Sequence, residues 1–447
     1  MTEGKNCLRA RGGARRAPAR RIAKLAARVV MAMAFFAMAG AHRALAGHDG
    51  KHFLVLQTNL QPPYQQLSNG ALTGSTIRLL DCAFQQIDID YGITLAPRQR
   101  NRDMTRKGQA DGFFLSRLSS EMDSYADATV PLVLEKWVWV SARRDVDVQV
   151  PVPLPDQMVT VGAVLGSNEA EWITEQGYRD FVHVPSLRSL LGLIGKGRID
   201  FALIDRQSFE RARDDLKLDP DSFSERFARY MPLVMYFAHE YTRAHPATLT
   251  RLNRALAECG SAAVKLEAQE IDRIMNDDVV RIRRLLRAPA LVNALKEHLE
   301  NLDMLHGEGM SRIKIAELDR QWREASKSGA ASLLAADILQ NDVSTYLQRA
   351  YRTRDVQFAE AFIFDRDGLI IGMSSPTSNY DQSHERKFAI FNETAADAVQ
   401  IADIYYDPST QKFLSQITLP ITDPVTGKVL AALTVGLDVL LALQVED

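Results

Sequence analysis

Polar side chains that suit a small ligand follow two buried-strand patterns in the middle of the chain. Gly166, Ser167 and Asn168 come after the strand pattern VTVGAV and before a helical pattern, so free backbone amides and a hydroxyl meet at a helix start. This arrangement favours an anionic ligand group, and simple helix capping explains it equally well. Asp205 ends the strand pattern IDFALID, where its carboxylate is expected to bind a ligand amine or to cap the next helix.

Three arginine residues lie close together earlier in the chain. Arg98, Arg100 and Arg102 cluster where the strand pattern ITLAPR ends. A guanidinium group binds a carboxylate through two parallel hydrogen bonds, so this cluster suits a carboxylate or another anion. A solvated basic patch is the alternative interpretation.

Motifs of enzyme active sites are missing from the sequence. It contains no G-x-S-x-G, HExxH, P-loop or GxGxxG pattern, and its nine histidines are scattered. His183 and His239 fall in strand-like segments, where a structural role is the simpler account. No Cys/His spacing indicates a metal, and nothing indicates a cofactor. We therefore expect a protein that is not an enzyme.

The charge distribution indicates an exported protein with an acidic body. Residues 1–46 contain ten Lys and Arg residues and one Glu, giving +9; the whole chain of 447 residues carries −2, which leaves −11 for the rest. An acidic body argues against a nucleic-acid partner, which favours a basic face. The Arg-rich start, the apolar stretch at 29–41 and the sequence Ala44-Leu45-Ala46 predict a signal peptide cleaved near Ala46 and a periplasmic product. An uncleaved membrane anchor is the alternative.

Cysteines are few. Cys7 lies in the predicted signal peptide, and Cys82 and Cys259 lie in the predicted mature chain. These two could pair in an oxidising compartment, but the folded geometry decides this and the sequence does not. Two buried free thiols are the slightly favoured interpretation.

Strand and helix patterns alternate from residue 52 to 240. A helix is expected from Ser75, with Ser75 or Thr76 as its N-cap residue, and a stiff linker at PVPLP separates two series of elements. Strands are expected at 52–57, 93–98, 111–114, 136–143, 159–166, 181–184, 199–205 and 230–240, with helices at 168–176 and 186–195. The alternation predicts an α/β fold with a mostly parallel sheet. Two chain crossings between two such lobes describe a hinged clamshell with a ligand cleft.

The last third of the chain follows a different pattern. Charged helical sequence runs over 246–300, and a long helical stretch is expected over 311–350. Strand patterns follow, with turns at Asp367-Gly368, Asp407-Pro408 and Thr426-Gly427. We expect an α+β domain that begins with a long helix.

Residues 52 to about 265 resemble the amino-acid-type periplasmic solute-binding family, family 3. The likeness rests on stretches that come in the family's order: PPY and NGALTG, KGQADGFFLSRLSSEMDSYADATVPL, VGAVLGSN and GKGRIDFALID. The resemblance implies a two-lobed clamshell that binds its ligand between the lobes.

The resemblance also implies roles for individual residues. Tyr64 would pack on the ligand, the loop of Gly166, Ser167 and Asn168 would contact a ligand carboxylate, and Asp205 would bind its amino group. Hydroxyls would come from Ser116 and Ser119. Met122 stands where the family has its carboxylate-binding arginine, so the usual α-amino acid ligand is not implied. Arg117 and Arg98 are the candidate substitutes.

Residues from about 285 to 443 resemble a PAS-like extracellular sensor domain of the Cache/PDC type. The D-x-x-G turn in FIFDRDGLIIGM and the closing strands LPITDPVTGKVLAALTVG carry the likeness. It implies a ligand site under the concave face of the sheet, with Tyr380, Asp381 and Glu385 as candidates. An ordinary polar loop is the alternative for these three residues.

These patterns together predict four segments: a signal peptide at 1–46, a solute-binding domain at 47–275 (lobe 1 about 52–142 and 240–275, lobe 2 about 145–230), a helical linker at 276–310 and a Cache/PDC-like domain at 311–447. The expected function is capture of a small polar or anionic metabolite, amino-acid-like or an organic acid. The expected partner is a membrane sensor kinase or an ABC permease. The alternatives are an enzyme on the same scaffold, such as a dehydratase, and an assembly module with a vestigial cleft.

Overall fold

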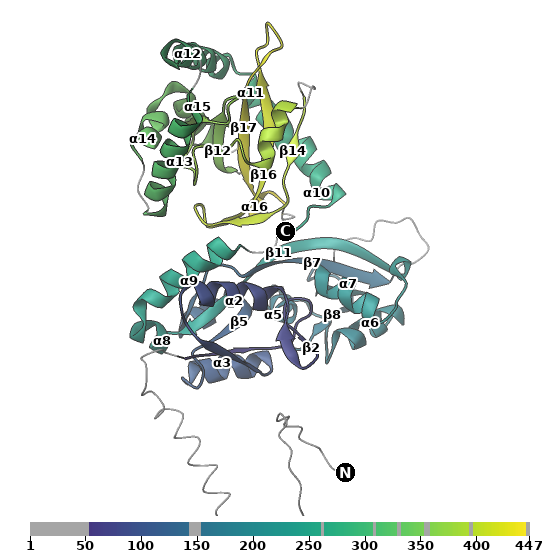
Figure 1. Ribbon diagram of the computed structural model, residues 1–447. Helices are drawn as coiled ribbons and strands as arrows, with labels where there is room; N and C mark the ends of the chain where they lie inside the picture. The colour runs from purple at the N-terminus through teal and green to yellow at the C-terminus, as the bar shows by residue number, and fades with distance from the viewer. Residues whose placement is uncertain are drawn as a thin grey trace, which may run out of the picture. The chain divides into compact units, whose positions relative to one another are not determined.

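The computed structural model describes residues 53–142, 153–260, 263–306, 310–328, 332–352, 358–392 and 397–443 (Figure 1). The predicted signal peptide and its cleavage site near Ala46 lie outside the described residues. None of the described helices is long and apolar enough to cross a membrane.

Residues 53–260 form an α/β unit around one nine-stranded sheet. Its strands run in the order β4 (Tyr91–Leu95), β1 (Leu54–Thr58), β5 (Gly112–Arg117), β11 (Phe223–Ala238), β7 (Val133–Ala142), β10 (Phe201–Asp205), β8 (Val161–Val164) and β9 (Phe181–Val184), and β6 (Ala126–Ala128) pairs with β11. Parallel pairs stand at both ends, and the long strands β7 and β11 are antiparallel in the middle. The α/β class expected from the alternating patterns is therefore confirmed.

Helices cover this sheet in two groups, which define two lobes (Figure 1). The first lobe holds β1, β4, β5 and β6 with α2 (Ser75–Gln86), α3 (Arg98–Arg106), α4 (Ser120–Asp123), α8 (His239–Ala244), α9 (Pro246–Cys259) and the hairpin of β2 (Gln66–Ser68) and β3 (Ala71–Thr73). The second lobe holds β8, β9 and β10 with α5 (Asn168–Gln176), α6 (Leu187–Gly195), α7 (Arg206–Asp215) and a 3-10 turn, η1 (Pro220–Ser222). Each lobe has its own apolar core, and β7 and β11 contribute to both.

Helix α2 begins at Ser75 as expected, but its cap residue differs from the prediction. Neither Ser75 nor Thr76 caps this helix, because Gly74 is the cap residue and no side chain takes that role. Gly74 has a φ of +133°, and a Cβ there would lie 2.0 Å from the carbonyl oxygen of Tyr64. Glycine is required because this left-handed backbone lies directly against the Tyr64 loop.

Cys82 of α2 and Cys259 of α9 form a disulfide, with Cα atoms 6.1 Å apart. The slightly favoured interpretation of two free thiols was therefore wrong. Folding brings the last residue of α9 beside a residue of α2 that is 177 positions away in the sequence. Bond formation depends on that proximity rather than on sequence spacing.

The C-terminal region is α+β. Its sheet is antiparallel, in the order β13 (Ile370–Met373), β12 (Phe358–Phe364), β17 (Val429–Asp438), β16 (Lys412–Thr422) and β14 (Gln400–Ile401), with β15 (Tyr405–Asp407) beside β16. The accompanying helices are α10 (Ala268–Arg273), the π-helical turn η2 (Ile274–Asp278), α11 (Val279–Leu286), α12 (Pro289–His306), α13 (Arg312–Lys327), α14 (Leu333–Gln340), α15 (Asp342–Arg352), the 3-10 turn η3 (Arg386–Asn392) and α16 (Val439–Ala442).

The single long helix expected over 311–350 is wrong, because three helices occupy this stretch. Ser332 caps α14 by accepting a hydrogen bond from the amide of Ala335. Asn341 has extended backbone, and its Oδ1 accepts from the amide of Ser344. Short polar side chains at these positions satisfy the free amides of a new helix start and end the preceding helix.

Candidate functional site

The facing sides of the two lobes meet at a buried hydrogen bond between Tyr64 and Asp205. The Tyr64 hydroxyl donates to Asp205 Oδ1 at 3.1 Å, and both side chains are buried. The other oxygen, Asp205 Oδ2, accepts from the amide of Ser208 at 2.9 Å and caps α7. The capping interpretation of Asp205 is thus confirmed, while its contact with a ligand stays a prediction. Burial raises the pKa of Asp205 to about 7.

Two further carboxylates accompany Asp205 in the same buried region. Glu135 of β7 accepts hydrogen bonds from Gln61 and from the indole Nε1 of Trp137. Glu169 accepts from the backbone amide of Asp205 at 3.1 Å. Burial, followed by the nearby charges of Asp205 and Glu169, raises the pKa of Glu135 well above its usual range.

Sequence reasoning missed Glu135 and Glu169. A signal was present for Glu135, because this charged residue interrupts the apolar strand pattern VLEKWVWV. Charged side chains are seldom fully buried unless they are paired. Glu169 gave no comparable signal, because an acid in the first turn of a helix is ordinary.

Arg98 is buried in α3 and reaches across to the second lobe. Its Nη1 donates to the carbonyl of Leu115 and to Asn168 Oδ1, both at 2.6 Å, and its Nη2 donates to Gln61 at 3.2 Å. Its Nε has no acceptor within the described structure. Arg98 and Asn168 were both predicted site residues, and folding places them in direct contact. Arg100, from the same cluster, is exposed.

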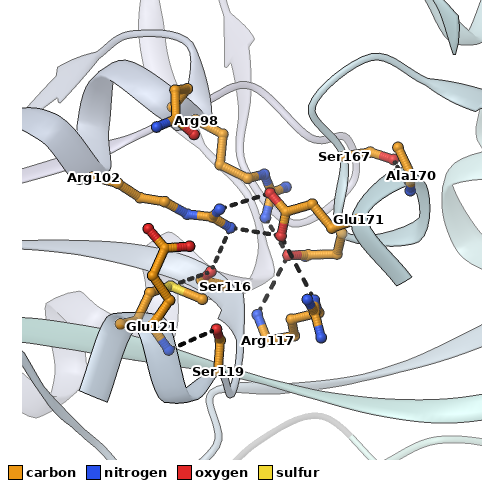
Figure 2. A network of polar contacts seen from close by, with 12 residues as sticks. Arg98, Arg102, Ser116, Arg117, Ser119, Glu121, Ser167, Ala170 and Glu171 are labelled. Carbon is orange, nitrogen blue, oxygen red and sulfur yellow. Dashed lines mark hydrogen bonds and ion pairs between the residues drawn. The ribbon is translucent and has the colours of Figure 1, made fainter. Parts of the chain in front are cut away.

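A second group of arginine contacts joins the lobes beside this buried region (Figure 2). Arg102 makes a bidentate contact with Glu171 of α5, at 2.7 and 2.9 Å, and also donates to Ser116 Oγ at 3.2 Å. Arg117 pairs with Glu171 at 3.6 Å and with Glu175. Of the predicted anion-binding arginines, Arg102 and Arg117 are therefore engaged by acids of the opposite lobe.

The two predicted serine hydroxyls at helix starts serve as caps (Figure 2). Ser167 Oγ accepts from the amide of Ala170 at 3.1 Å, and Ser119 Oγ accepts from the amide of Glu121 at 3.3 Å. Gly166 has a φ of +69° and lies at the turn into α5. Ser116 lies in β5 rather than on the loop after it. Ligand contacts of these residues stay predictions.

The three candidates of the C-terminal region are only partly brought together. Tyr380 is buried, stacks on Trp322 at 5.5 Å between ring centroids, and lines a cavity of about 740 Å³. Asp381 accepts from the amide of Ser383, and Glu385 is exposed; neither lines that cavity. Of these three, the structure therefore connects Tyr380 alone with a cavity.

Comparisons with known proteins give likenesses to solved structures. No protein-family model and no curated protein matches the chain. A histidine kinase sensor domain with similarity to periplasmic binding proteins matches with 18% identity and a TM-score of 0.41, over 47% of this chain and 91% of that one. The arginine-, lysine-, histidine-binding protein ArtJ of Geobacillus stearothermophilus matches with 14% identity and a TM-score of 0.37, over 46% and 89%. Holo ArgBP of T. maritima matches with 14% identity and a TM-score of 0.38, over 50% and 95%.

Proposed function

We propose that residues 53–260 bind a small polar metabolite between their two lobes and that the protein is not an enzyme. The observation that carries this proposal is the buried polar cluster to which both lobes contribute, with Tyr64 bonded to Asp205 and Arg98 to Asn168. Burying so many polar groups costs free energy, because each loses its hydration. Because the burial does not favour stability, a role in ligand binding between the two lobes is the better explanation for these groups.

The charges of the cluster favour a ligand that carries a positively charged nitrogen. Glu135, Glu169 and Asp205 are all buried, and Arg98 is the buried guanidinium that contacts this group through Gln61. A cation placed among these carboxylates compensates, by its electrostatic attraction, for the hydration that they lose on burial. An organic anion would instead have to displace Glu171 from the bidentate contact with Arg102. An amine or amino-acid-like ligand therefore fits better than an organic acid.

The proposed setting is the periplasm, after export, with a membrane sensor kinase or an ABC permease as the partner. A ligand that contacts both lobes stabilises the closed arrangement, and a partner that distinguishes closed from open lobes detects binding. The additional C-terminal α+β region favours sensing over uptake. We propose that this region is a Cache/PDC-like domain.

A thermal-shift screen tests the proposal on the full chain with amino acids, amines and organic acids. A ligand at 100 times its Kd stabilises the native state by about 2.7 kcal/mol, so at least one amine-bearing compound should raise the Tm by several degrees. Asp205→Ala should abolish this shift, and Asp214→Ala, at an exposed acid of α7, should leave it intact. A panel without any stabilising compound would contradict the binding site, and conversion of the bound compound, detected by mass spectrometry, would favour the enzyme alternative.

A further inference from the structure

Two acidic residues at the start of α10, Glu267 and Glu270, are held by side chains of the α/β unit of residues 53–260. Lys136 of β7 is buried, and its Nζ donates to Glu267 at 2.6 Å and to Glu270 at 2.8 Å. The hydroxyl of Tyr230 on β11 donates to Glu270 as well. Arg206, the first residue of α7, forms an ion pair with Glu267. Lysine, arginine and tyrosine thus converge on one short segment, residues 267–270 at the start of α10.

These cations directly follow, in the sequence, two buried acids of the proposed ligand site between the lobes (the cleft). Lys136 follows Glu135, and Arg206 follows Asp205. The two positions are also neighbours in the sheet, because Asp205 of β10 lies opposite Trp137 of β7. Successive side chains of a strand point to opposite faces, so Glu135 contacts Gln61 on one face and Lys136 contacts Glu270 on the other.

The same two acids, Glu267 and Glu270, also form the N-terminal cap of α10. The amide of Glu267 donates to Glu270 Oε2 at 2.9 Å, so Glu270 serves both the helix start and Lys136. Five residues of π-helix, Ile274–Asp278, follow α10 directly. π-helical turns occur often at functional positions of helices. A shift of Lys136 or Arg206 would therefore change the groups that define the first turn of α10.

We propose that Lys136 and Arg206 couple the state of the cleft to α10, which makes this helix the output element of the α/β unit of residues 53–260. The inference rests on the proposed function of the cleft. In this proposal, a change around Glu135 or Asp205 shifts β7 relative to β10. Lys136 and Arg206, the residues that follow these two acids, then shift against Glu267 and Glu270. The coupling is a positioning effect, since neither Lys136 nor Arg206 contacts the proposed ligand.

Hydrogen exchange of the full-length, ligand-free protein tests this coupling. The perturbation is Glu135→Gln, which replaces one of the two oxygens that accept from Gln61 and Trp137 with an amide donor. The measured quantity is the exchange rate of amides in 268–278. Glu135→Gln should change these rates about 5- to 100-fold, the range of ordinary coupling between sites. In the background K136M/R206M, the same substitution should change them less than about twofold. The control background is R211M, at an exposed arginine of α7 that pairs with Asp215, and there the full change should persist.

Two outcomes would overturn the coupling: no change on Glu135→Gln in the otherwise wild-type protein, or an equal change in the K136M/R206M background. A purely structural role for the cations alters the rates of K136M/R206M itself but does not remove its response to Glu135→Gln. If Glu135→Gln fails to fold, Glu171→Lys perturbs the cleft from α5 and is read in the same way. Because no ligand is added, a negative screen for ligands and a negative coupling experiment remain separate results.

Discussion

The carboxyl group of Asp205 has both of its oxygens in use within the protein. One oxygen accepts from Tyr64 and the other from the amide of Ser208, which starts α7. A ligand amine must therefore share an oxygen with Tyr64 or displace its hydroxyl. Each carboxylate oxygen has two lone pairs, so sharing is chemically reasonable. In the proposed function, this residue links ligand binding to the position of α7.

Asp205 should also give the stability of the protein a characteristic pH dependence. Its pKa is about 7 in the folded protein against an ordinary value of 3.8. The folded state therefore holds the proton more tightly, so this contribution is complete below pH 3.8 and is lost as the pH rises to about 7. Between pH 4 and pH 8, wild type should lose on the order of 4 kcal/mol of unfolding free energy relative to Asp205→Asn. Urea unfolding across this range measures the difference, and parallel curves for the two proteins would contradict the raised pKa.

Helices α2 and α9 show how one covalent contact secures the first lobe. Both helices contribute to the same apolar core, through Leu80 and Leu252 among others, and the bond between Cys82 and Cys259 joins them. Loop closure over a separation of 177 residues removes many conformations from the unfolded chain. The bond is also compatible with the oxidising compartment proposed for this protein.

Replacing both cysteines, Cys82→Ala and Cys259→Ala together, should lower the unfolding free energy by about 2–5 kcal/mol. The main reason is that the unfolded chain regains the conformations that the loop had excluded. Chemical denaturation with and without a thiol reductant measures this effect. The reductant should destabilise wild type and leave the double variant unchanged, and an identical response of the two proteins would contradict the role of the bond.

The two lobes are held against each other by contacts that involve no ligand. Arg102 and Arg117 of the first lobe share Glu171 of the second, and Ser208 Oγ donates to the carbonyl of Pro62 at 3.0 Å. Arg102 is buried, so its bidentate contact is screened less by water than a surface ion pair. These contacts within the protein itself therefore stabilise the observed arrangement of the lobes, and the proposed ligand would add to that preference.

Charge reversal at Glu171 should separate the lobes. Glu171→Lys places a third cation beside Arg102 and Arg117, and like charges at such short distances repel strongly. Small-angle X-ray scattering should show a larger radius of gyration for this variant, and high salt should reduce the difference. Asp214→Lys, an equal charge change at an exposed position of α7, is the matched control. Equal radii for Glu171→Lys and wild type would show that these ion pairs do not hold the lobes together.

Local sequence patterns determined much of the fold. The strand at 181–184 and the helix at 168–176 have the bounds that were predicted. The turn at Asp367-Gly368 lies between β12 and β13 as expected. These features depend on side-chain periodicity, on turn residues and on caps, all of which act within a few positions of the chain. The break between α14 and α15 was missed, because the apolar periodicity continues across Asn341.

The site was decided by tertiary structure. The sequence singled out Asp205, Tyr64 and Arg98, but not the partners that each would have. Those partners lie far away along the chain: Tyr64 is 141 positions from Asp205, and Arg98 is 70 positions from Asn168. Such pairs exist because the order of strands in the sheet and the closure of two lobes bring distant chain segments together. Tertiary packing also buried Glu135 and, within the first lobe, joined Cys82 to Cys259. The periodicity of each segment by itself does not predict those contacts.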